Sequence, residues 1–386
     1  MPLHEKTLKR PPEPPFALPA TWTKRTLPAL RKALATWFAA NCRAMPWRAS
    51  RDAYPIWVSE VMLQQTTVAA VVPFFERFLA AFPTVRHLAE ADEQRVLHLW
   101  AGLGYYRRAR HLHAAAKRLV ADHAGDLPDD PAVWADLPGV GRYILGAVLS
   151  QAFERKLPIV EANSLRVLSR WFASPLDPRF GVGQKWVWAA AAAVLPDAQV
   201  GDFNQAVMEL GATVCTPVAP KCGECPAAKW CEAKRLGLQA SIPPKPKAKA
   251  IVSVAEVGVV LHDDRAVCLF QRRPDAKRWA GMWEVPHGEV LEGETLEAAA
   301  ARVVRELTGF AIELGEELVV VRHGVTRYAI TLTGFTANRV GGAFAPGHYV
   351  QYREVPAGEL ADYPMSTSQR QLLTEWRRPN RPRRLF

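Results

Sequence analysis

The sequence has no run of about 18 apolar residues, the length that a helix needs to cross a bilayer. It opens with a proline-rich stretch that lacks the apolar core of a secretory signal peptide. It contains only 6 cysteines in 386 residues, which excludes a disulfide framework. Acidic residues are also in deficit, with 38 Asp and Glu against 49 Lys and Arg and a net charge of +11. We therefore expect a soluble cytoplasmic protein without membrane contact, whose partner is a polyanion such as nucleic acid or another anionic surface.

The chain is long enough for two to three domains and shows no internal repeat. From about Thr26 to Arg235, apolar residues recur every three or four positions between helix caps and Pro/Gly breaks, which predicts an all-α half. The segment Ser241–Ala250, reading SIPPKPKAKA, predicts an extended and solvated linker. Short β-rich runs with one helix follow it and predict an α+β half. The expected parts are a flexible proline-rich start at 1–24, a helical domain at 25–240, a linker at 241–251, an α+β domain at 252–376 and a basic tail at 377–386.

Several elements have clear enough signals to be given bounds. In the first half, helices are expected at Pro55–Leu63, Asp92–Trp100, Asp130–Asp136 and Gly183–Leu195. In the second half, the polar turn 262–265 lies between two β-rich runs and predicts a hairpin. The other elements expected there are a helix at Thr295–Leu307 ended by Gly309 and strands at Val252–Leu261, Ala266–Gln271, Leu318–Arg322 and Tyr328–Phe335.

Four of the six cysteines are crowded into one short segment, at Cys215, Cys222, Cys225 and Cys231. Four thiolates at the spacing C-x6-C-x2-C-x5-C can surround a metal with sulfur. By ligand chemistry alone, a four-cysteine zinc site and a [4Fe-4S] cluster fit about equally well, and neither ferredoxin spacing matches. A metal site of one of these two kinds is predicted.

The turn Leu137-Pro138-Gly139-Val140-Gly141 lies between two helical stretches. Its glycines permit a tight turn that leaves backbone N–H groups free at the start of the next helix, and such groups bind phosphate oxygens. As a bare pattern it is as well explained by a simple interhelical turn. With the cysteine spacing and the segments MPWR (45–48), SEVMLQQT (59–66) and GLGYY (102–106), however, it resembles the helix-hairpin-helix DNA glycosylases of the endonuclease III and MutY kind. In that family the cysteines hold a [4Fe-4S] cluster, so the resemblance implies this cofactor here.

The resemblance implies an enzyme that extrudes a base from duplex DNA and cleaves its bond to deoxyribose. Such chemistry protonates the base and stabilises a sugar cation, so two carboxyl groups in different environments are expected. Glu60 lies in an apolar helical segment, where burial would raise its pKa and keep a proton available. Glu161 stands where the family has the Asp of Asp-Gly-Asn, and the resemblance assigns it to stabilising the sugar cation. A carboxylate at a helix start is also explained as a favourable partner of the helix dipole. Tyr143 stands where lyase members carry a Schiff-base lysine, which implies a monofunctional glycosylase.

The resemblance also implies a set of DNA-contacting residues. The wedge residues that fill the gap in the base stack would be Gln65 and Tyr105, and the extruded adenine would meet Arg43 and Gln205. The remaining contacts of the first half are assigned to Trp47, Leu137, Gly139 and Gly141.

The segment Trp279–Pro286 and the residues after it resemble a Nudix fold, like the MutT-like C-terminal domain of MutY. A Nudix pyrophosphatase needs several carboxylates for its divalent metal. Here Glu306 is present, but Val303 and Leu307 stand where two further glutamates would be. The resemblance therefore implies a fold retained without hydrolysis.

In the family this domain recognises 8-oxoguanine through a Phe-Ser-His loop. The corresponding segment here is Val325-Thr326-Arg327, in which Thr326 can hydrogen bond as serine would and Arg327 can donate to a base edge or a phosphate. Ordinary strand residues are the alternative interpretation of this segment.

The predicted function is a monomeric DNA glycosylase that removes adenine opposite 8-oxoguanine or guanine from double-stranded DNA, associated with the nucleoid through that DNA. Two alternatives stay open. The departures at Glu161, Ala162 and the Val-Thr-Arg loop favour a glycosylase of the same fold with a changed choice of lesion. A non-catalytic protein that binds damaged DNA would equally keep the hairpin, the wedge residues and the cluster.

Overall fold

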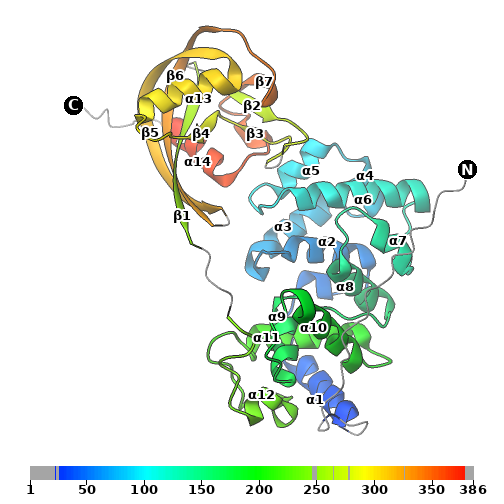
Figure 1. Ribbon diagram of the computed structural model, residues 1–386. Coiled ribbons are helices and arrows are strands. Elements are labelled where there is room, and N and C mark those ends of the chain that lie inside the picture. The colour runs from blue at the N-terminus through cyan, green and yellow to red at the C-terminus, as the bar shows by residue number, and fades with distance from the viewer. Residues whose placement is uncertain are drawn as a thin grey trace, which may run out of the picture. The chain divides into compact units, whose positions relative to one another are not determined.

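The computed structural model describes Trp22 and residues 26–245, 250–263, 265–276, 279–325 and 327–378 (Figure 1). The chain divides into two compact units. The first comprises residues up to Leu79 together with Arg118–Lys247, and the second comprises Ala80–Lys117 together with the chain from Ala248 onward. The basic tail expected at 377–386 lies outside the described residues beyond Arg378, as does the start expected at 1–24 apart from Trp22.

The first unit is helical, as the sequence predicts. Asp52 and Asp130 cap the helices that follow them, each by accepting a hydrogen bond from a backbone N–H in the first turn. The long helix α6 (Arg107–His123) continues from the second unit into the first. The other elements of the first unit are α1 (Thr26–Asn41), η1 (Pro46–Arg48), α2 (Ala53–Leu63), α3 (Val68–Ala81), α7 (Pro131–Asp136), α8 (Arg142–Phe153), α9 (Ala162–Trp171), α10 (Gly181–Val194), α11 (Val200–Thr213), η2 (Ala228–Trp230) and α12 (Glu232–Arg235).

Two helix pairs form the interior of this unit: α2 packs on α8, and α9 packs on α11. Nine of the 11 residues of α2 are buried, because its apolar side chains surround the helix instead of lining one face. Any polar side chain on α2 is thereby carried into the interior. Within the ranges that the structure describes, every helix falls short of the length or apolarity that a bilayer-spanning helix would need.

The segment expected as a solvated linker is partly anchored. Ser241–Lys245 forms no helix or strand, but Ile242 is buried and its carbonyl accepts a hydrogen bond of 2.8 Å from Arg170 Nε. The start of this segment is therefore held on the first unit, which corrects the expectation that all of it is solvated. Residues 246–249 lie outside the described ranges.

The second unit contains two short helices, α4 (Val85–Glu90) and α5 (Glu93–Trp100), and an α+β fold built on two sheets. One sheet has the strand order β4-β1-β6-β5, with β1 parallel to β6, and the other has the order β3-β2-β7. The elements after the linker are β1 (Val252–Leu261), β2 (Ala266–Arg272), β3 (Trp283–Glu284), β4 (His287–Glu289), α13 (Leu296–Thr308), β5 (Phe310–Val325), β6 (Tyr328–Gly342), β7 (Tyr349–Pro356), η3 (Leu360–Asp362) and α14 (Thr367–Trp376).

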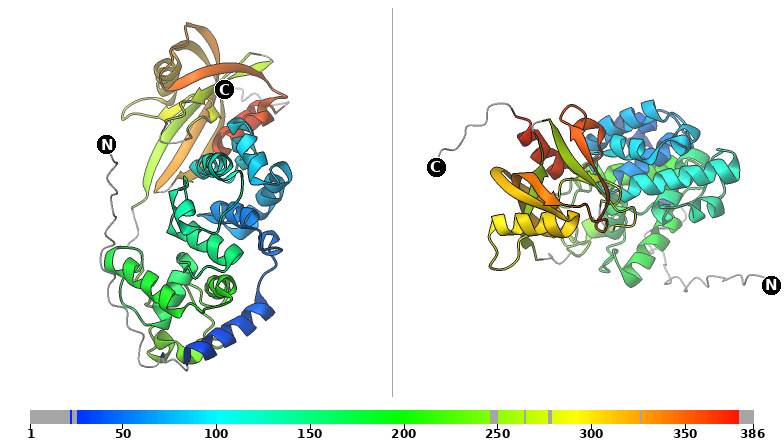
Figure 2. Two further views of the ribbon diagram at one scale, coloured as in Figure 1. Left: turned by 90° about the vertical axis from the view of Figure 1, so that its right-hand side faces the viewer. Right: turned by 90° about the horizontal axis from the view of Figure 1, so that it is seen from above.

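The two last helices cover opposite faces of the sheet that contains β1 (Figure 2). Val257 and Val259 of β1 belong to the same apolar cluster as α13, whereas Val260 belongs to the cluster that contains Leu372 of α14. Successive strand residues point to opposite faces, so the apolar run in β1 supplies both cores.

The prediction of a hairpin around residues 262–265 is wrong. β1 and β2 follow one another along the chain but enter different sheets, joined by a single bridge between His262 and Val267. β1 is paired with β4 on one side and with β6 on the other, so no edge is left for β2. The predicted helix at Thr295–Leu307 is confirmed as α13, capped by Thr295 and ended by Gly309.

Candidate active site

A carboxyl group is buried between α2 and α8. Glu60 of α2 is 4% exposed, and its two oxygens accept hydrogen bonds from two different side chains of α8. The hydroxyl of Tyr143 donates to Oε2, and Nε2 of Gln151 donates to Oε1 at 3.0 Å. Tyr143 and Gln151 are eight residues apart, about two turns of α8, so both can face α2 from the same side of one helix. The site is thus built where two buried helices meet.

The electrostatics of this group follow from its burial. Burial raises the pKa of Glu60, and the hydrogen bonds from Tyr143 and Gln151 and the charge of Arg48 only partly oppose it. Burial and the nearby carboxylates of Glu60 and Glu161 raise the pKa of Tyr143 well above its ordinary value, so the phenol stays protonated. The direction expected for Glu60 from its apolar surroundings is therefore found.

The second predicted carboxylate, Glu161, is the N-cap of α9. Its Oε2 accepts from the backbone N–H of Asn163 and its Oε1 from that of Ser164, each at 2.8 Å, and the Ser164 hydroxyl accepts from the backbone N–H of Glu161. This is a capping box. Burial raises the pKa of Glu161, the backbone donors lower it, and the charge of Glu60 raises it further. Because the charge of Glu60 acts on Glu161 and both carboxylates act on Tyr143, the three belong to one electrostatic site.

The segment before Glu161 is seated against α8 by a glycine. A Cβ atom added at Gly146 would lie 2.4 Å from the carbonyl oxygen of Pro158, closer than real contacts allow. Asn204 of α11 holds the same segment, accepting from the backbone N–H of Ile159 and donating to the carbonyl of Leu157 at 2.9 Å. Glu161 is consequently positioned by both α8 and α11.

An ion-pair network lies beside the site, and its centre, the buried Glu209 of α11, was not predicted. Oε2 of Glu209 accepts from Nη2 of Arg43 at 3.1 Å and from Nη2 of Arg48 at 3.0 Å. Nε of Arg48 donates to Oε1 of Gln205 at 2.9 Å. Burial alone would raise the pKa of Glu209, but the two arginines outweigh burial and hold that pKa below its usual value. An acidic residue in an apolar helical segment was the available signal, the same one that singled out Glu60.

The structure places the other predicted contacts in different settings. Gln65 and Tyr105 both have left-handed backbones, with φ of 60° and 49°, and both side chains are exposed, Tyr105 by 51%. Such strain in non-glycine residues is often kept at functional sites. Trp47, in contrast, is buried and packs edge-on against Phe75.

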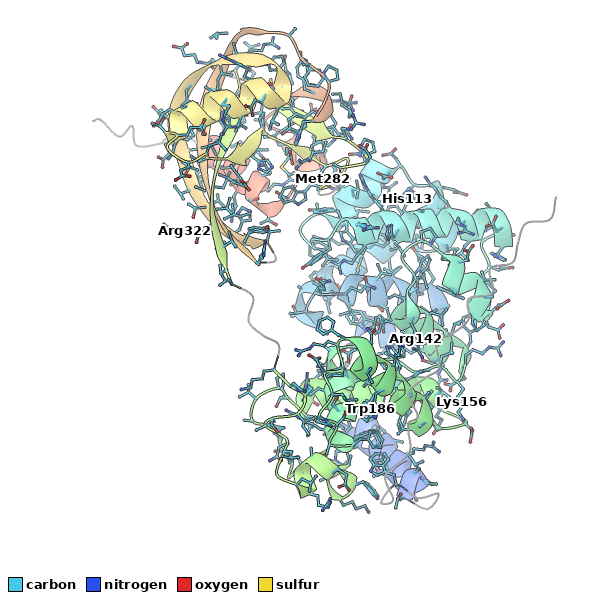
Figure 3. The ribbon with its side chains drawn as sticks, viewed as in Figure 1. His113, Arg142, Lys156, Trp186, Met282 and Arg322 are labelled. Atoms are coloured by element: carbon cyan, nitrogen blue, oxygen red, sulfur yellow. The ribbon has the colours of Figure 1, made fainter. Side chains whose placement is uncertain are left out.

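The glycine turn joins α7 to α8 as expected. Gly139 has a φ of 77°, and Gly141 is the N-cap of α8 without a side-chain cap, while Leu137 is buried. Arg142, the first residue of α8, is labelled in Figure 3. Its guanidinium lies over the ring of Trp188 of α10, 4.0 Å from the ring centroid. The first N–H groups of α8 are therefore not covered by an N-cap side chain.

The four clustered cysteines are free thiols, all half-buried, in the loop that follows α11. Burial raises the pKa of Cys225 to about 12, with the other three cysteines adding to the effect, so the four lie in one neighbourhood. Nη1 of Arg170 donates to Sγ of Cys215 at 3.3 Å. Among the described residues, no group of three or more His, Cys, Asp or Glu side chains has an arrangement that could hold a metal ion. The donor set of four soft thiolates, with an N–H donor to sulfur, fits an anionic metal–sulfur group.

In the second unit, Thr326 lies outside the described residues. Arg327, beside it at the end of the β5–β6 hairpin, is exposed and donates to the hydroxyl of Tyr328 at 3.2 Å. A pocket of about 420 Å³ is lined by Arg327 and Tyr328 together with His323 and Arg322, the last of which is labelled in Figure 3. Val303 and Leu307 pack in the core under α13, which accounts for their apolar character.

Comparisons with known proteins agree with this geometry. Residues 58–179 match the HhH-GPD superfamily of base excision DNA repair proteins, and residues 256–375 match the NUDIX domain. The adenine DNA glycosylase of Rattus norvegicus is 42% identical over 219 residues, which are 54% of this chain and 42% of that protein. The adenine DNA glycosylase of Buchnera aphidicola subsp. Schizaphis graminum (strain Sg) is 30% identical over 263 residues, 68% of this chain and 76% of that protein.

Among solved structures, a thermostable thymine-DNA glycosylase is similar with a TM-score of 0.51 and 28% identity, covering 55% of this chain and 98% of that one. The chain spans less than half of the length of the mammalian relatives that it matches. It spans about three quarters of the Buchnera protein. With a helix-hairpin-helix unit that holds the carboxyl groups of Glu60 and Glu161 and a Nudix domain after it, this chain belongs to the adenine DNA glycosylase family.

Proposed function

We propose that the protein is a monofunctional adenine DNA glycosylase that acts on adenine opposite 8-oxoguanine or guanine in double-stranded DNA. The observation that carries the proposal is a pair of carboxyl groups in different surroundings, the buried Glu60 and the half-buried Glu161. Glu60 accepts only side-chain hydrogen bonds, whereas Glu161 accepts two from backbone N–H groups. Family membership supports the same function.

The two carboxyl groups have separate roles in the proposed reaction. Glu60, whose raised pKa favours the protonated form, gives its proton to the adenine ring. The electrons of the N-glycosidic bond then leave with the base, and the carboxylate of Glu161, held on the first turn of α9, stabilises the cationic sugar. Water adds to the sugar carbon and releases a proton, so the products are free adenine and an abasic site.

The neighbouring groups orient the base and the DNA. Arg48 is held by Glu209 and Gln205 and lies close enough to affect the pKa of Glu60, so this network forms one side of the adenine site. The exposed side chains of Gln65 and Tyr105 are the wedge residues that fill the gap left by the extruded base. The uncapped start of α8 after Gly141 binds a phosphate of the backbone.

We assign a [4Fe-4S] cluster to the cysteine loop, with Cys215, Cys222, Cys225 and Cys231 as ligands. When bound, the cluster cross-links the loop through its thiolates and so acts as a structural group. Exposed cations lie in the loop, at Lys221 and Lys229, and in α12, at Lys234 and Arg235, of which Arg235 is paired with Glu232. The three lysines are the cations that would contact DNA phosphates. The protein would act on DNA as a monomer in the cytoplasm, associated with the nucleoid through its substrate.

The proposal is tested with duplexes that contain adenine opposite 8-oxoguanine or guanine, scored for free adenine and for strand cleavage after heating in base. The wild-type protein should release adenine, and Glu60→Gln should not, while its affinity for the same duplex stays within about twofold because the shape is kept. Glu76→Gln, at an exposed position of α3, is the matched control and should behave as the wild type. Adenine release by Glu60→Gln at an appreciable rate would show that Glu60 is not the acid.

A second candidate is a glycosylase of this fold with another choice of base. It is favoured by one observation: Glu161, which stands in place of the family's Asp, has both oxygens committed to the start of α9. A panel of other mispairs in the same assay separates the two candidates. If the second domain recognises the base that is paired with the adenine, Arg327→Ala should reduce the preference for 8-oxoguanine over guanine at that position without abolishing adenine release.

A further inference from the structure

Gln151 is the polar partner of Glu60 that neither the motifs nor the proposed chemistry takes into account. It is 7% exposed, and its Nε2 donates to Oε1 of Glu60 at 3.0 Å. Burying a carboxamide is destabilising unless its hydrogen bonds are made, so this contact compensates for the desolvation of the Gln151 amide group. The contact joins α8 to α2 across the interior of the first unit.

The two partners of Glu60 are chemically unequal. The hydroxyl of Tyr143 can donate or accept, because it rotates about its C–O bond, whereas the NH₂ group of Gln151 can only donate. A proton on Oε1 of Glu60 would point at a hydrogen of Gln151, while a proton on Oε2 can be accepted by the Tyr143 oxygen. When Glu60 is neutral, its proton therefore belongs on Oε2.

We propose that Gln151 is a positioning residue that orients the carboxyl group of Glu60 and confines its transferable proton to Oε2, the oxygen beside Tyr143. The catalytic meaning of this role rests on the proposed function. An acid transfers its proton well only when the proton faces its acceptor, so a carboxyl that is free to turn would present the wrong oxygen for part of the time.

The same contact affects the charge of Glu60. The groups that face it are Tyr143 and Gln151 from α8, Arg48 from η1 and the carboxylate of Glu161 at the start of α9. Gln151 lowers the pKa of Glu60 by stabilising the carboxylate, against the larger effect of burial. Removing the donor while keeping the volume should accordingly raise that pKa.

The variant Gln151→Met removes the donor and keeps a side chain of similar length. Leu149→Met is the matched control, because Leu149 is buried in the same helix, and exchanges between leucine and methionine are well tolerated in cores. The first readout needs no activity: the ¹³C signal of the Glu60 carboxyl, assigned by its loss in Glu60→Gln, is followed against pH. In Gln151→Met the titration midpoint of the Glu60 carboxyl should rise by about one pH unit, the scale of one hydrogen bond to a charged group. In Leu149→Met this midpoint should equal that of the wild type.

The second readout is the single-turnover rate of adenine release against pH. Release requires protonated Glu60, so the limb on which the rate falls with rising pH should move up by about one unit in Gln151→Met, and the maximal rate should fall roughly tenfold or more. Affinity for the duplex should not change. A carboxyl midpoint equal to that of the wild type, or a lower rate with an unmoved limb, would overturn the proposal, because loss of packing alone gives that result. If the wild type releases no adenine, the proposed function fails, and the ¹³C titration still decides whether Gln151 controls the proton of Glu60.

Discussion

The hydroxyl of Tyr143 donates a hydrogen bond to Oε2 of Glu60, which places a phenol against the group that carries the proposed acid function. The Tyr143 side chain is half-buried, and desolvation of its hydroxyl together with the charges of Glu60 and Glu161 raises its pKa well above the ordinary value. It therefore remains a neutral hydroxyl at physiological pH. A phenol cannot form a Schiff base with an abasic sugar, so this residue orients the carboxyl group without joining covalent chemistry.

The first prediction follows from this contact. The wild-type protein should leave the DNA strand intact until the product is heated in base, and borohydride should trap no covalent adduct. Tyr143→Lys should introduce some strand cleavage at the abasic product, because an amine then stands beside the site. Adduct and nicked strand are both measured on denaturing gels. Borohydride trapping of the wild-type protein would contradict the monofunctional assignment.

The second prediction concerns Glu161. Glu161→Gln should abolish adenine release, because a neutral amide cannot stabilise the sugar cation, and Glu161→Asp should not improve on the wild type. Glu161→Gln also weakens the cap of α9, so a control must weaken the cap alone. Ser164→Ala removes the reciprocal bond of the capping box and should cost about 1 kcal/mol of stability while most of the activity is kept. Equal losses of rate in Ser164→Ala and Glu161→Gln would assign Glu161 to helix capping only.

The third prediction concerns the thiol loop. The purified protein should be brown and contain about four irons per chain, because four thiolates hold a cluster of this kind. Cys222→Ser should lower the iron content, the thermal stability and the affinity for DNA together. Cys42→Ser changes an exposed thiol outside the loop and should alter none of these. Metal analysis that finds one zinc and no iron would refute the cluster.

The fourth prediction is a pH dependence of the Nudix domain. Burial would lower the pKa of His287, but the charge of Glu284 and the hydrogen bond to Glu256 outweigh burial and raise it to about 9. The folded state thus favours the protonated ring. The stabilisation, at most about 3 kcal/mol, should be complete below pH 6.5 and be lost as pH rises through about 9.

Urea unfolding of the wild type and of His287→Gln tests this dependence. The difference in their free energies of unfolding should be large at pH 6 and small at pH 10, where the ring is neutral in the folded and the unfolded states. Comparing the two proteins at each pH cancels the other groups that titrate in this range. A difference that is the same at both pH values would mean that His287 stabilises the domain by packing alone.

Much of the local structure and part of the candidate site could be predicted from the sequence. The helix starts at Asp52, Asp92 and Asp130 carry their own capping side chains, and the apolar run around Glu60 indicates a buried carboxyl before any contact is known. The cysteine loop is likewise a local pattern. These features depend on residues within a few turns of one another, so spacing and residue type are sufficient to indicate them.

The partners of these groups were decided only by the tertiary structure. Glu60 and Tyr143 are 83 residues apart, and Arg43 and Glu209 are 166 residues apart. No periodicity carries information over such distances, so Gln151 could not be recognised as part of the site, and for Glu209 the sequence indicated only an acidic residue in an apolar helix. The same limit explains why β1 and β2 were expected to form a hairpin. Sequence patterns determine which segments are helix or strand and which of their residues are buried. The packing of whole elements decides which buried groups meet, because every pairing of elements competes with all other pairings for the same surface.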